Sequence, residues 1–197
     1  MLTLYHAPNS RSSRFIWLLE ELGVAHEVVY CDIARRSGRG APDPRNPHPE
    51  RRVPALLHDG QLITEQAAIA LYLTDAFPAA GLGAAMGEPL RGAYLSWLAF
   101  YAGEVDPTYN ARVLYGDRLD AMTTRDHDRV KARVMAALEA GPYLLGAEFS
   151  AADILVSGPF EWEATSEPAE PRIQAWLSRL SQRPAAQRAA ARDLAST

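Results

Sequence analysis

Hydrophobic residues near the start of the chain switch between two spacings. Over residues 2–5 apolar and polar positions alternate, as they do in a short strand. From Ser12 the apolar positions recur at helical spacing until Gly23, a residue type that commonly ends helices. The run 26–33 is rich in β-branched and aromatic residues and predicts a second strand. The chain therefore begins with a predicted strand–helix–strand unit.

A segment rich in proline, glycine and arginine, residues 34–52, predicts a loop before the next apolar run. Residues 53–64 form two short apolar runs joined by Asp59-Gly60, the strongest short-range signal for a β-hairpin. Apolar positions directly after the hairpin lie on one helical face, and this helix should end before Pro78. The predicted order is strand, helix, strand, loop, strand, strand, helix.

The pattern changes after the second predicted helix. Residues 79–89 are rich in glycine and alanine and indicate a linker. Beyond it the apolar positions have helical spacing, and Ser150 with Asp153 forms a predicted N-terminal capping box for one of these helices. We therefore expect an α/β domain over residues 1–78, a linker over 79–89 and an all-helical domain over 90–197.

Composition and charge narrow the range of partners. Of 197 residues 48% are hydrophobic and the formal net charge is −4, which allows a sizeable core but gives no basic excess for nucleic acid. Arg35, Arg36 and Arg39 lie close together, but the glycines between them favour a solvated loop. No apolar run approaches the ~20 residues that span a bilayer, and no signal peptide is visible. We expect a cytoplasmic protein.

Cys31 is the single cysteine, which excludes an intrachain disulfide and any metal site built from several cysteines. Its apolar-rich surroundings favour a half-buried thiol on a strand. We expect no bound metal.

Pro8, Asn9 and Ser10 form a predicted turn at the start of the first helix. The N–H groups of a helix start favour anions, and a serine hydroxyl there can donate a further hydrogen bond. Serine near a helix start is also the usual capping residue, and capping is the stronger interpretation of Ser12 and Ser13. The turn holds no cysteine and no acid, so it offers donors rather than an activated nucleophile.

Two later positions also suggest ligand binding. Pro54 cannot donate to a sheet ladder and suits the first residue of a strand; if the Val53-Pro54 bond is cis, the backbone of Val53 can face an extended ligand. Thr64 could simply cap the second helix. Alternatively, Glu65 could bind the ammonium of an amino-acid head group while Gln66 and the helix N–H groups bind its carboxylate.

Four segments together resemble the cytosolic glutathione transferases, in a bacterial style. They are YHAPNSRSSRFIWLLEELGV, RRVPALLHDGQLITEQAAIALYL, PYLLGAEFSAADILV and SQRPAAQRA, and they extend from the first strand to the last helix. The motif VPAL followed by LITE-x-x-AI, with FSAADI in the second half, is the most specific part. The resemblance implies a thioredoxin-like N-terminal domain, an all-helical C-terminal domain, a homodimer, and glutathione bound between the two domains.

The resemblance also implies roles for single residues. Pro54 matches the cis-proline of the family, and Val53 matches the residue whose backbone pairs with the cysteinyl part of glutathione. Glu65 and Gln66 match the acid–serine pair that holds the γ-glutamyl head, with Gln in place of the usual Ser; a primary amide can still donate to a carboxylate. Arg52 matches a commonly basic position that could pair with the glycyl carboxylate, or it is a solvated loop arginine.

The residue that activates the glutathione thiol is open among four candidates. Ser10 falls at the catalytic position of the serine-type classes, with Asn9 next to it. Ser12 falls where another bacterial class has a serine after its cysteine, and Arg11 replaces that cysteine. Tyr5 lies near the position of the activating tyrosine of other classes.

We expect a glutathione transferase that stabilises the thiolate for attack on a small hydrophobic electrophile, as in detoxification. Tyr101, Tyr109, Arg112 and Tyr115 are candidates for the second-substrate pocket, although a helical tyrosine is more often a core or surface residue. The alternatives are a glutathione-dependent peroxidase or isomerase on the same site, or a non-catalytic transferase-like protein that binds ligands or serves as a scaffold.

Overall fold

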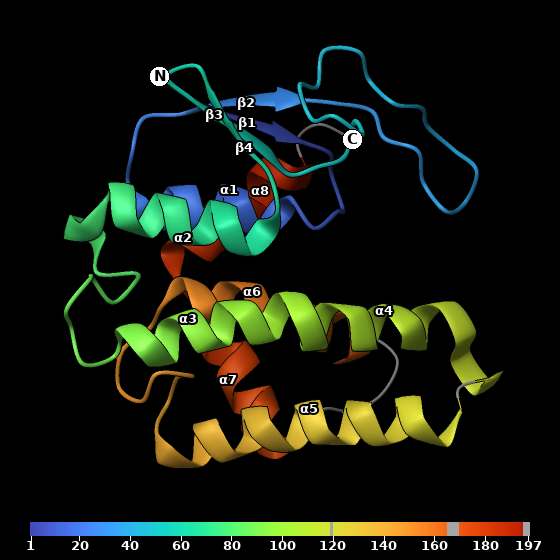
Figure 1. The fold of residues 1–197 in the computed structure, drawn as a ribbon, viewed down its shortest axis with the longest axis vertical. Helices are drawn as coiled ribbons and strands as arrows, with labels where there is room; N and C mark the ends of the chain where they lie inside the picture. The colour runs from blue at the N-terminus through green and yellow to red at the C-terminus, as the bar shows by residue number, and fades with distance from the viewer. Residues whose placement is uncertain (119, 165–169, 195–197) are drawn as a thin grey trace. The chain divides into compact units, whose positions relative to one another are not determined.

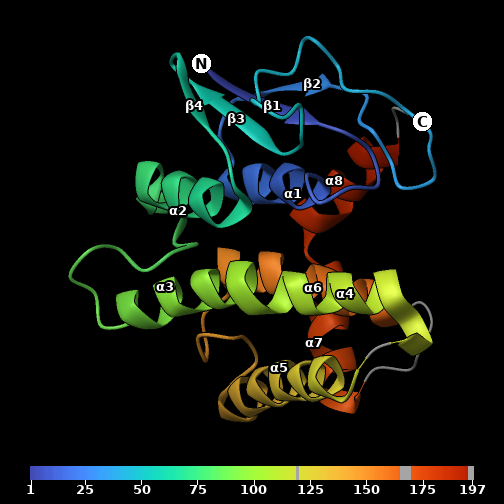
Figure 2. The ribbon, with the colours of Figure 1, turned by 45° about the vertical axis from the view of Figure 1, so that its right-hand side comes forward.

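The computed structural model describes residues 1–118, 120–164 and 170–194. Contacts divide the chain into two compact units (Figures 1 and 2). One contains Met1–Ala80 and the segment that begins at Gln182, and the other is Gly81–Ser181.

The first unit contains a four-stranded mixed sheet. Its strands are β1 (Leu2–His6), β2 (Glu27–Tyr30), β3 (Ala55–His58) and β4 (Gln61–Ile63), in the spatial order β2-β1-β3-β4. Strand β1 pairs with β2 in parallel and with β3 antiparallel, and β3 pairs antiparallel with β4. The element order in this unit is the one that the hydrophobic pattern predicts.

The β3–β4 hairpin turns at Asp59 and Gly60, which both have positive φ values of 47° and 83°. Two residues with positive φ suit a tight two-residue hairpin, because their twist matches that of the flanking strands. In the resulting register His58 lies opposite Gln61. The hairpin prediction is confirmed.

Helices α1 (Ser13–Leu22) and α2 (Gln66–Ala76) lie on one face of the sheet (Figures 1 and 2). Helix α1 buries almost its whole length and ends where Gly23 takes φ of 65° and donates its N–H to the carbonyl of Leu19 over 3.1 Å. This is the left-handed stop that glycine permits without a steric penalty. Helix α2 ends before Pro78, as expected.

A third helix of this unit, α8 (Pro184–Leu194), comes from the end of the chain and packs against α1. Ala185 and Ala189 are buried and lie one turn apart, so small side chains allow a close approach between helices. The sequence pattern groups residues 90–197 as one helical domain, whereas the contacts place α8 with the N-terminal unit. Within that expected domain, residues 119, 165–169 and 195–197 lie outside the described residues.

The second unit is helical. Helices α3 (Arg91–Phe100) and α4 (Asp106–Tyr115) are joined by the π-helical turn Tyr101–Val105, and a 3-10 turn, Gly116–Arg118, follows α4. Three helices complete the described part of this unit, namely α5 (Ala121–Ala140), α6 (Ala151–Ala164) and α7 (Pro171–Ser181).

The predicted capping box is present at the start of α6. The Asp153 carboxylate accepts the N–H of Ser150 over 3.0 Å, as the box requires. It also accepts the N–H of Leu144 over 2.9 Å and the indole N–H of Trp176 over 3.0 Å. The box therefore ties α7 and the preceding loop to α6. Among the residues that the structure describes, no helix is long and apolar enough to cross a membrane.

Candidate functional site

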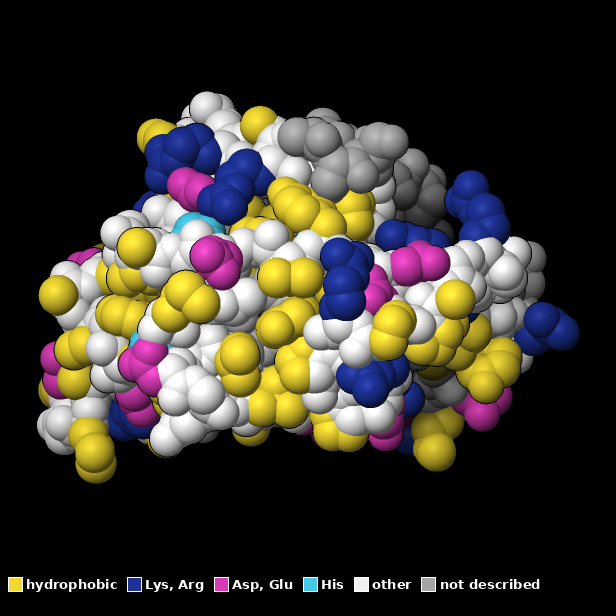
Figure 3. Space-filling model, turned by 90° about the horizontal axis from the view of Figure 1, so that it is seen from above, with side chains coloured by type: hydrophobic (Ala, Val, Ile, Leu, Met, Phe, Trp, Pro, Cys, Tyr) yellow, Lys and Arg dark blue, Asp and Glu magenta, His cyan; other side chains and the backbone are white. Residues whose placement is uncertain are grey.

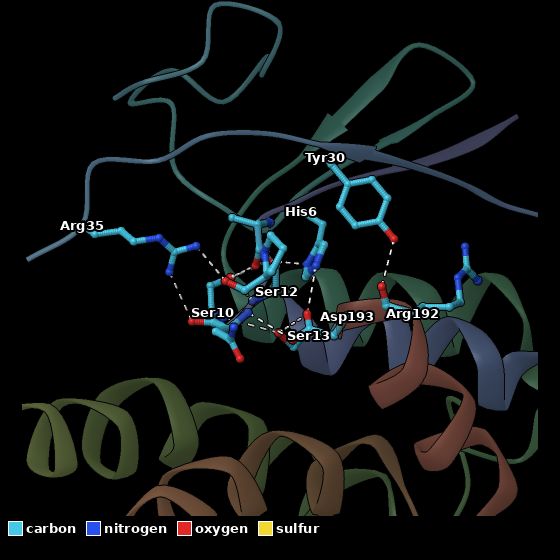
Figure 4. A network of polar contacts seen from close by, with 11 residues as sticks. His6, Ser10, Ser12, Ser13, Tyr30, Arg35, Arg192 and Asp193 are labelled. Atoms are coloured by element: carbon cyan, nitrogen blue, oxygen red, sulfur yellow. Dashed lines mark hydrogen bonds and ion pairs between the residues drawn. The ribbon is translucent and has the colours of Figure 1, made fainter. Parts of the chain in front are cut away.

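The turn between β1 and α1 is a compact network of hydroxyl groups (Figure 4). Ser10 is partly exposed, and its hydroxyl lies 2.7 Å from both the carbonyl oxygen of Ala7 and the Oγ atom of Ser12. The N–H of Ser12 donates to Ser10 Oγ over 3.2 Å. Hydrogen bonds therefore fix the Ser10 hydroxyl on its protein side, while part of the residue faces solvent.

Ser12 is fully buried, and its side chain does not cap α1. Its hydroxyl lies 2.8 Å from Nδ1 of His6 and accepts the N–H of Ala7 over 3.1 Å. The capping interpretation of Ser12 is therefore wrong, because the hydroxyl is used by a strand residue that the sequence pattern does not place next to it. Burial also leaves Ser12 without a surface that a ligand could contact directly.

His6 is fully buried on β1, and sequence reasoning did not single it out. Its Nε2 atom lies 3.0 Å from the Asp193 carboxylate. Burial lowers the pKa of His6 to about 4, against the opposing effect of Asp193. The imidazole is therefore neutral at physiological pH.

Asp193 reaches the turn from α8. Its carboxylate accepts the N–H of Asn9 over 3.0 Å and the hydroxyl of Ser13 over 2.7 Å, in addition to facing His6 (Figure 4). One side chain thus contacts the strand end, the turn and the first residue of α1. Nothing in the local sequence of the turn indicates this partner, since it lies 184 residues from Asn9.

Asn9 has φ of 53°, and its side chain is exposed. Arg35 donates to the carbonyl oxygen of Pro8 over 2.7 Å and makes a long contact of 3.5 Å with that of Asn9 (Figure 4). The segment is a loop, as expected, with Arg36 and Arg39 exposed, but the Arg35 side chain is half-buried against the turn. Its guanidinium instead supports the turn and brings positive charge to it.

Tyr5 lies on β1 next to His6, paired in register with Val29 and Ala55. Successive side chains of a strand point to opposite faces of the sheet. The His6 side chain faces Ser12, so the side chain of Tyr5 points away from the turn. This geometry disfavours Tyr5 as the activating residue.

The Val53-Pro54 peptide bond is cis and directly precedes β3. The loop before it is held by Asn46, which is fully buried and donates its side-chain amide to the carbonyl of Arg52 over 2.9 Å. The Arg52 side chain itself is exposed and pairs with Glu50 over 2.8 Å. The backbone of this segment is therefore fixed, while the guanidinium of Arg52 lies at the surface.

Glu65 has φ of 66° and ψ of 125°, a conformation that costs a non-glycine residue free energy and tends to occur at ligand sites. It occupies the N-cap position of α2, so Thr64 is not the cap. Gln66 begins α2, and its amide oxygen accepts a long hydrogen bond of 3.5 Å from Arg14. The NH₂ end of the same amide is the part that can donate to a carboxylate.

The four residues predicted for a second-substrate pocket lie in the helical unit. Tyr101 is buried, and its hydroxyl donates to Asp106 over 3.2 Å. Tyr109 is also buried and donates to Glu163 over 3.2 Å, while Nε of Arg112 lies 3.4 Å from the same carboxylate. Burial and then the Glu163 charge raise the pKa of the Tyr109 hydroxyl. Both tyrosines are therefore engaged within the unit, which favours a structural role.

Tyr115, a further candidate, lies at the end of α4 with 54% of its surface exposed. Cys31 lies directly after β2 and is buried, whereas a half-buried position on the strand was expected. Burial, followed by the charge of Asp43, raises the pKa of its thiol. A buried thiol with a raised pKa is a poor nucleophile.

Within the described ranges, no three His, Cys, Asp or Glu side chains gather in a way that could hold a metal ion.

Charged side chains are mixed on the face shown in Figure 3, where Lys and Arg are interspersed with Asp and Glu. A surface that binds nucleic acid gathers basic side chains into one patch or stripe. The visible face has no such patch among the described residues, in keeping with the net charge of −4.

Residues 4–81 match the family model of the glutathione S-transferase N-terminal domain. A glutathione S-transferase of Xanthomonas campestris is 29% identical over 172 residues, which cover 82% of each chain. Among solved structures, a glutathione transferase of Methylococcus capsulatus is 31% identical with a TM-score of 0.79 and 98% of both chains covered. A sphingomonad glutathione S-transferase complexed with glutathione is 29% identical with a TM-score of 0.78, covering 97% of this chain and 98% of the other. The expected fold, a thioredoxin-like domain with an all-helical domain, is confirmed.

Proposed function

Because this chain belongs to the glutathione S-transferase family, we propose that it binds glutathione and stabilises its thiolate for attack on a small hydrophobic electrophile. The turn between β1 and α1 provides the activating group, and the nucleophile arrives with the ligand. No cysteine or other strong nucleophile is needed in the turn itself.

One observation carries the assignment of the activating group. Of the three candidates in the turn, Ser12 is buried and Asn9 has an exposed side chain, whereas Ser10 is partly exposed and anchored by the N–H of Ser12. A catalytic donor has to reach the ligand and also keep a fixed position. Ser10 meets both requirements, so we assign it as the residue that contacts the sulfur.

The glutathione subsite is built from the start of β3 and the start of α2. We assign the backbone of Val53, before the cis Pro54, to the cysteinyl part of glutathione. Glu65 and the amide NH₂ of Gln66, beside the helix N-terminus, bind the γ-glutamyl ammonium and carboxylate. Arg52 is at the surface and can exchange Glu50 for the glycyl carboxylate at little cost, because exposed ion pairs are weak.

The electrostatics of the turn favour a thiolate. A free thiol has a pKa near ~8.5 and is mostly protonated at pH 7. Hydrogen-bond donation to the sulfur, the start of α1 and the guanidinium of Arg35 all favour the charged form. Each unit by which the thiol pKa falls corresponds to ~1.36 kcal/mol, so a two-unit fall makes most bound glutathione a thiolate at pH 7.

The activity is tested by turnover of an aryl halide with Ser10→Ala, Ser12→Ala and Asn9→Ala variants. We expect the largest loss, roughly 10–100-fold, for Ser10→Ala, because it removes the donor that contacts sulfur. Equal activity in all three variants would refute a side-chain activator in this turn.

The alternative functions are separated by two further measurements. A hydroperoxide assay run in parallel separates transferase from peroxidase activity. Absence of binding to glutathione resin would favour the non-catalytic alternative.

We further propose that the protein is a cytoplasmic homodimer, as the family resemblance implies. Sedimentation velocity at micromolar concentration distinguishes a dimer from a monomer of 21.6 kDa.

The side chains of Tyr101 and Tyr109 do not identify the electrophile, because both are buried within the helical unit.

A further inference from the structure

The turn network continues inward as a single chain of polar contacts (Figure 4). Ser10 Oγ lies 2.7 Å from Ser12 Oγ, which lies 2.8 Å from His6 Nδ1, and His6 Nε2 lies 3.0 Å from Asp193 Oδ1. The chain begins at a partly exposed hydroxyl and ends at a carboxylate on α8. The three inner groups are not needed to contact glutathione, so their arrangement calls for another role.

The direction of the protons follows from the carboxylate at the inner end. Asp193 already accepts the N–H of Asn9 and the hydroxyl of Ser13, and an ionised carboxylate is an acceptor only. A neutral His6 must therefore carry its proton on Nε2, since a bare ring nitrogen 3.0 Å from Oδ1 would be repelled. Its Nδ1 atom is then an acceptor, and the hydroxyl of Ser12 donates to it.

This assignment also fixes the outer half of the chain. Ser12 Oγ accepts the N–H of Ala7 with one lone pair, which leaves the other for the hydroxyl of Ser10. Ser10 in turn accepts the N–H of Ser12 and has one lone pair left. The single proton of Ser10 points inward, where the Ala7 carbonyl oxygen and Ser12 Oγ both lie 2.7 Å from Ser10 Oγ. The outward-facing group of Ser10 is therefore an acceptor that suits the S–H of a bound thiol.

We propose that Ser10, Ser12 and His6 form a proton relay for the glutathione thiol, with Asp193 as its positioning residue. The proposal rests on the proposed function. The S–H bond breaks as Ser10 Oγ takes that proton, Ser10 passes its own proton to Ser12, and Ser12 passes its own to His6 Nδ1. The products are a thiolate, an imidazolium facing Asp193, and a Ser10 hydroxyl that now donates to the sulfur.

Two charges stabilise the transferred proton. Burial disfavours the imidazolium in the ligand-free protein, so His6 starts as the neutral acceptor that the relay requires. After the transfer, Asp193 faces the imidazolium on one side and the new thiolate lies at the other end of the relay. His6 therefore holds the proton only while the thiolate is present. After the sulfur has bonded to carbon, the proton passes back through Ser12 and Ser10 to the anion left by the electrophile or to water.

Asp193 owes its position to the packing of α8 on α1. Arg183 pairs with Glu21 over 2.6 Å, and Arg188 pairs with Glu20 over 2.8 Å. Arg192, next to Asp193, also pairs with Glu20 over 2.6 Å. These ion pairs fix the end of α8 beside the turn without using any relay residue.

The relay is tested by counting protons when the wild-type protein binds glutathione at pH 7. Thiolate formation is measured by its ultraviolet absorbance, and proton release by a pH-indicator dye in weak buffer. S-methylglutathione, which has no ionisable thiol, supplies the baseline. The relay predicts that each thiolate appears with much less than one released proton, because the proton stays on His6.

Release of one full proton per thiolate would overturn the relay and leave the proposed function intact. Glutathione that binds but stays protonated would contradict both, as would an absence of binding. This measurement needs no variant, so it does not depend on whether a buried substitution is tolerated.

Asp193→Asn supplies a second, independent test. An asparagine amide can donate to Nε2 and so favour the tautomer with its proton on Nδ1, which reverses the direction of the relay. We expect the thiolate fraction at pH 7 to fall roughly tenfold and to recover at high pH, with a full proton released per thiolate. Arg172→Ala, which removes an exposed ion pair with Glu139 away from α8 and the turn, should change neither quantity. A wild-type thiolate fraction and proton count in Asp193→Asn would overturn the role of Asp193.

Discussion

At the scale of single residues, the activating turn combines features that the sequence reveals to different degrees. Ser10 could be identified as a candidate because the turn and the helix start are both local patterns. The choice between Ser10 and Ser12 required burial, since the two hydroxyls are only 2.7 Å apart and differ mainly in which one faces solvent. The partners His6 and Arg35 carry no local signal, because each meets the turn through the folding of another segment.

The buried His6 leads to a prediction on stability. Its pKa is about 4 in the folded chain and about 6.5 when unfolded, so between these values the unfolded state binds more protons. The free energy of unfolding should therefore increase as the pH rises from about 4 to 6.5, and the same amount is lost when the pH is lowered through this range. The contribution of this one group should be about 3 kcal/mol across the window. Chemical denaturation at several pH values, compared with His6→Gln, measures it.

The variant should lack this part of the pH dependence, because glutamine does not titrate. If wild type and His6→Gln lose stability in parallel between pH 6.5 and 4, the titration of His6 does not cause this pH dependence. A constant offset between the two curves would reflect packing alone.

At the scale of elements, α8 is the feature that the hydrophobic pattern misassigns. Its helical spacing correctly predicts a helix, but spacing does not say which helix it packs against. In the structure Arg183 pairs with Glu21 and Arg188 pairs with Glu20, and these contacts join α8 and the residue before it to α1. By contrast, the hairpin and the capping box depend on short segments and were predicted correctly.

The docking of α8 can be measured with a double-mutant cycle on Arg183 and Glu21. The guanidinium donates two hydrogen bonds of 2.6 and 2.9 Å to a carboxylate whose side chain is only 9% exposed. We expect a coupling free energy of roughly 1–3 kcal/mol for Arg183→Met with Glu21→Gln, measured by denaturant unfolding. Glutamine retains an acceptor for the indole N–H of Trp17, which donates to Glu21 over 2.9 Å.

The pair Arg172–Glu139 is a matched control, because its 2.6 Å contact joins side chains that are 51% and 61% exposed. Its coupling should be about 0–0.5 kcal/mol, as for most surface ion pairs. Equal coupling in both pairs would mean that the Arg183 contact does little to hold α8 against α1.

At the scale of the whole molecule, the chain is two compact units whose boundary in sequence differs from the boundary expected from composition. The glycine- and alanine-rich segment 79–89 does mark a change from the mixed sheet to helices. The last helix nevertheless belongs with the sheet, so the N-terminal unit includes both ends of the described chain. A sequence pattern can locate the linker, but the return of α8 depends on long-range contacts that no single segment encodes.

Because α8 packs in the N-terminal unit, it also supplies Asp193, the carboxylate at the inner end of the candidate site. Residues 4–81 match the family model of the N-terminal domain, yet Asp193 lies outside that range. The candidate site is therefore larger than the domain that identifies the family. Substitutions on α8 belong among the variants used to study this chemistry.

The proposed function requires the turn at Ser10 to ionise the thiol of bound glutathione. The most direct test is a pH titration of the thiolate absorbance of glutathione bound to wild type and to Ser10→Ala. We predict a pKa roughly two units below the ~8.5 of a free thiol in wild type, and a value within about one unit of the free thiol in the variant. A wild-type thiol pKa equal to that of free glutathione, or the same depressed pKa in both proteins, would show that Ser10 does not ionise the thiol.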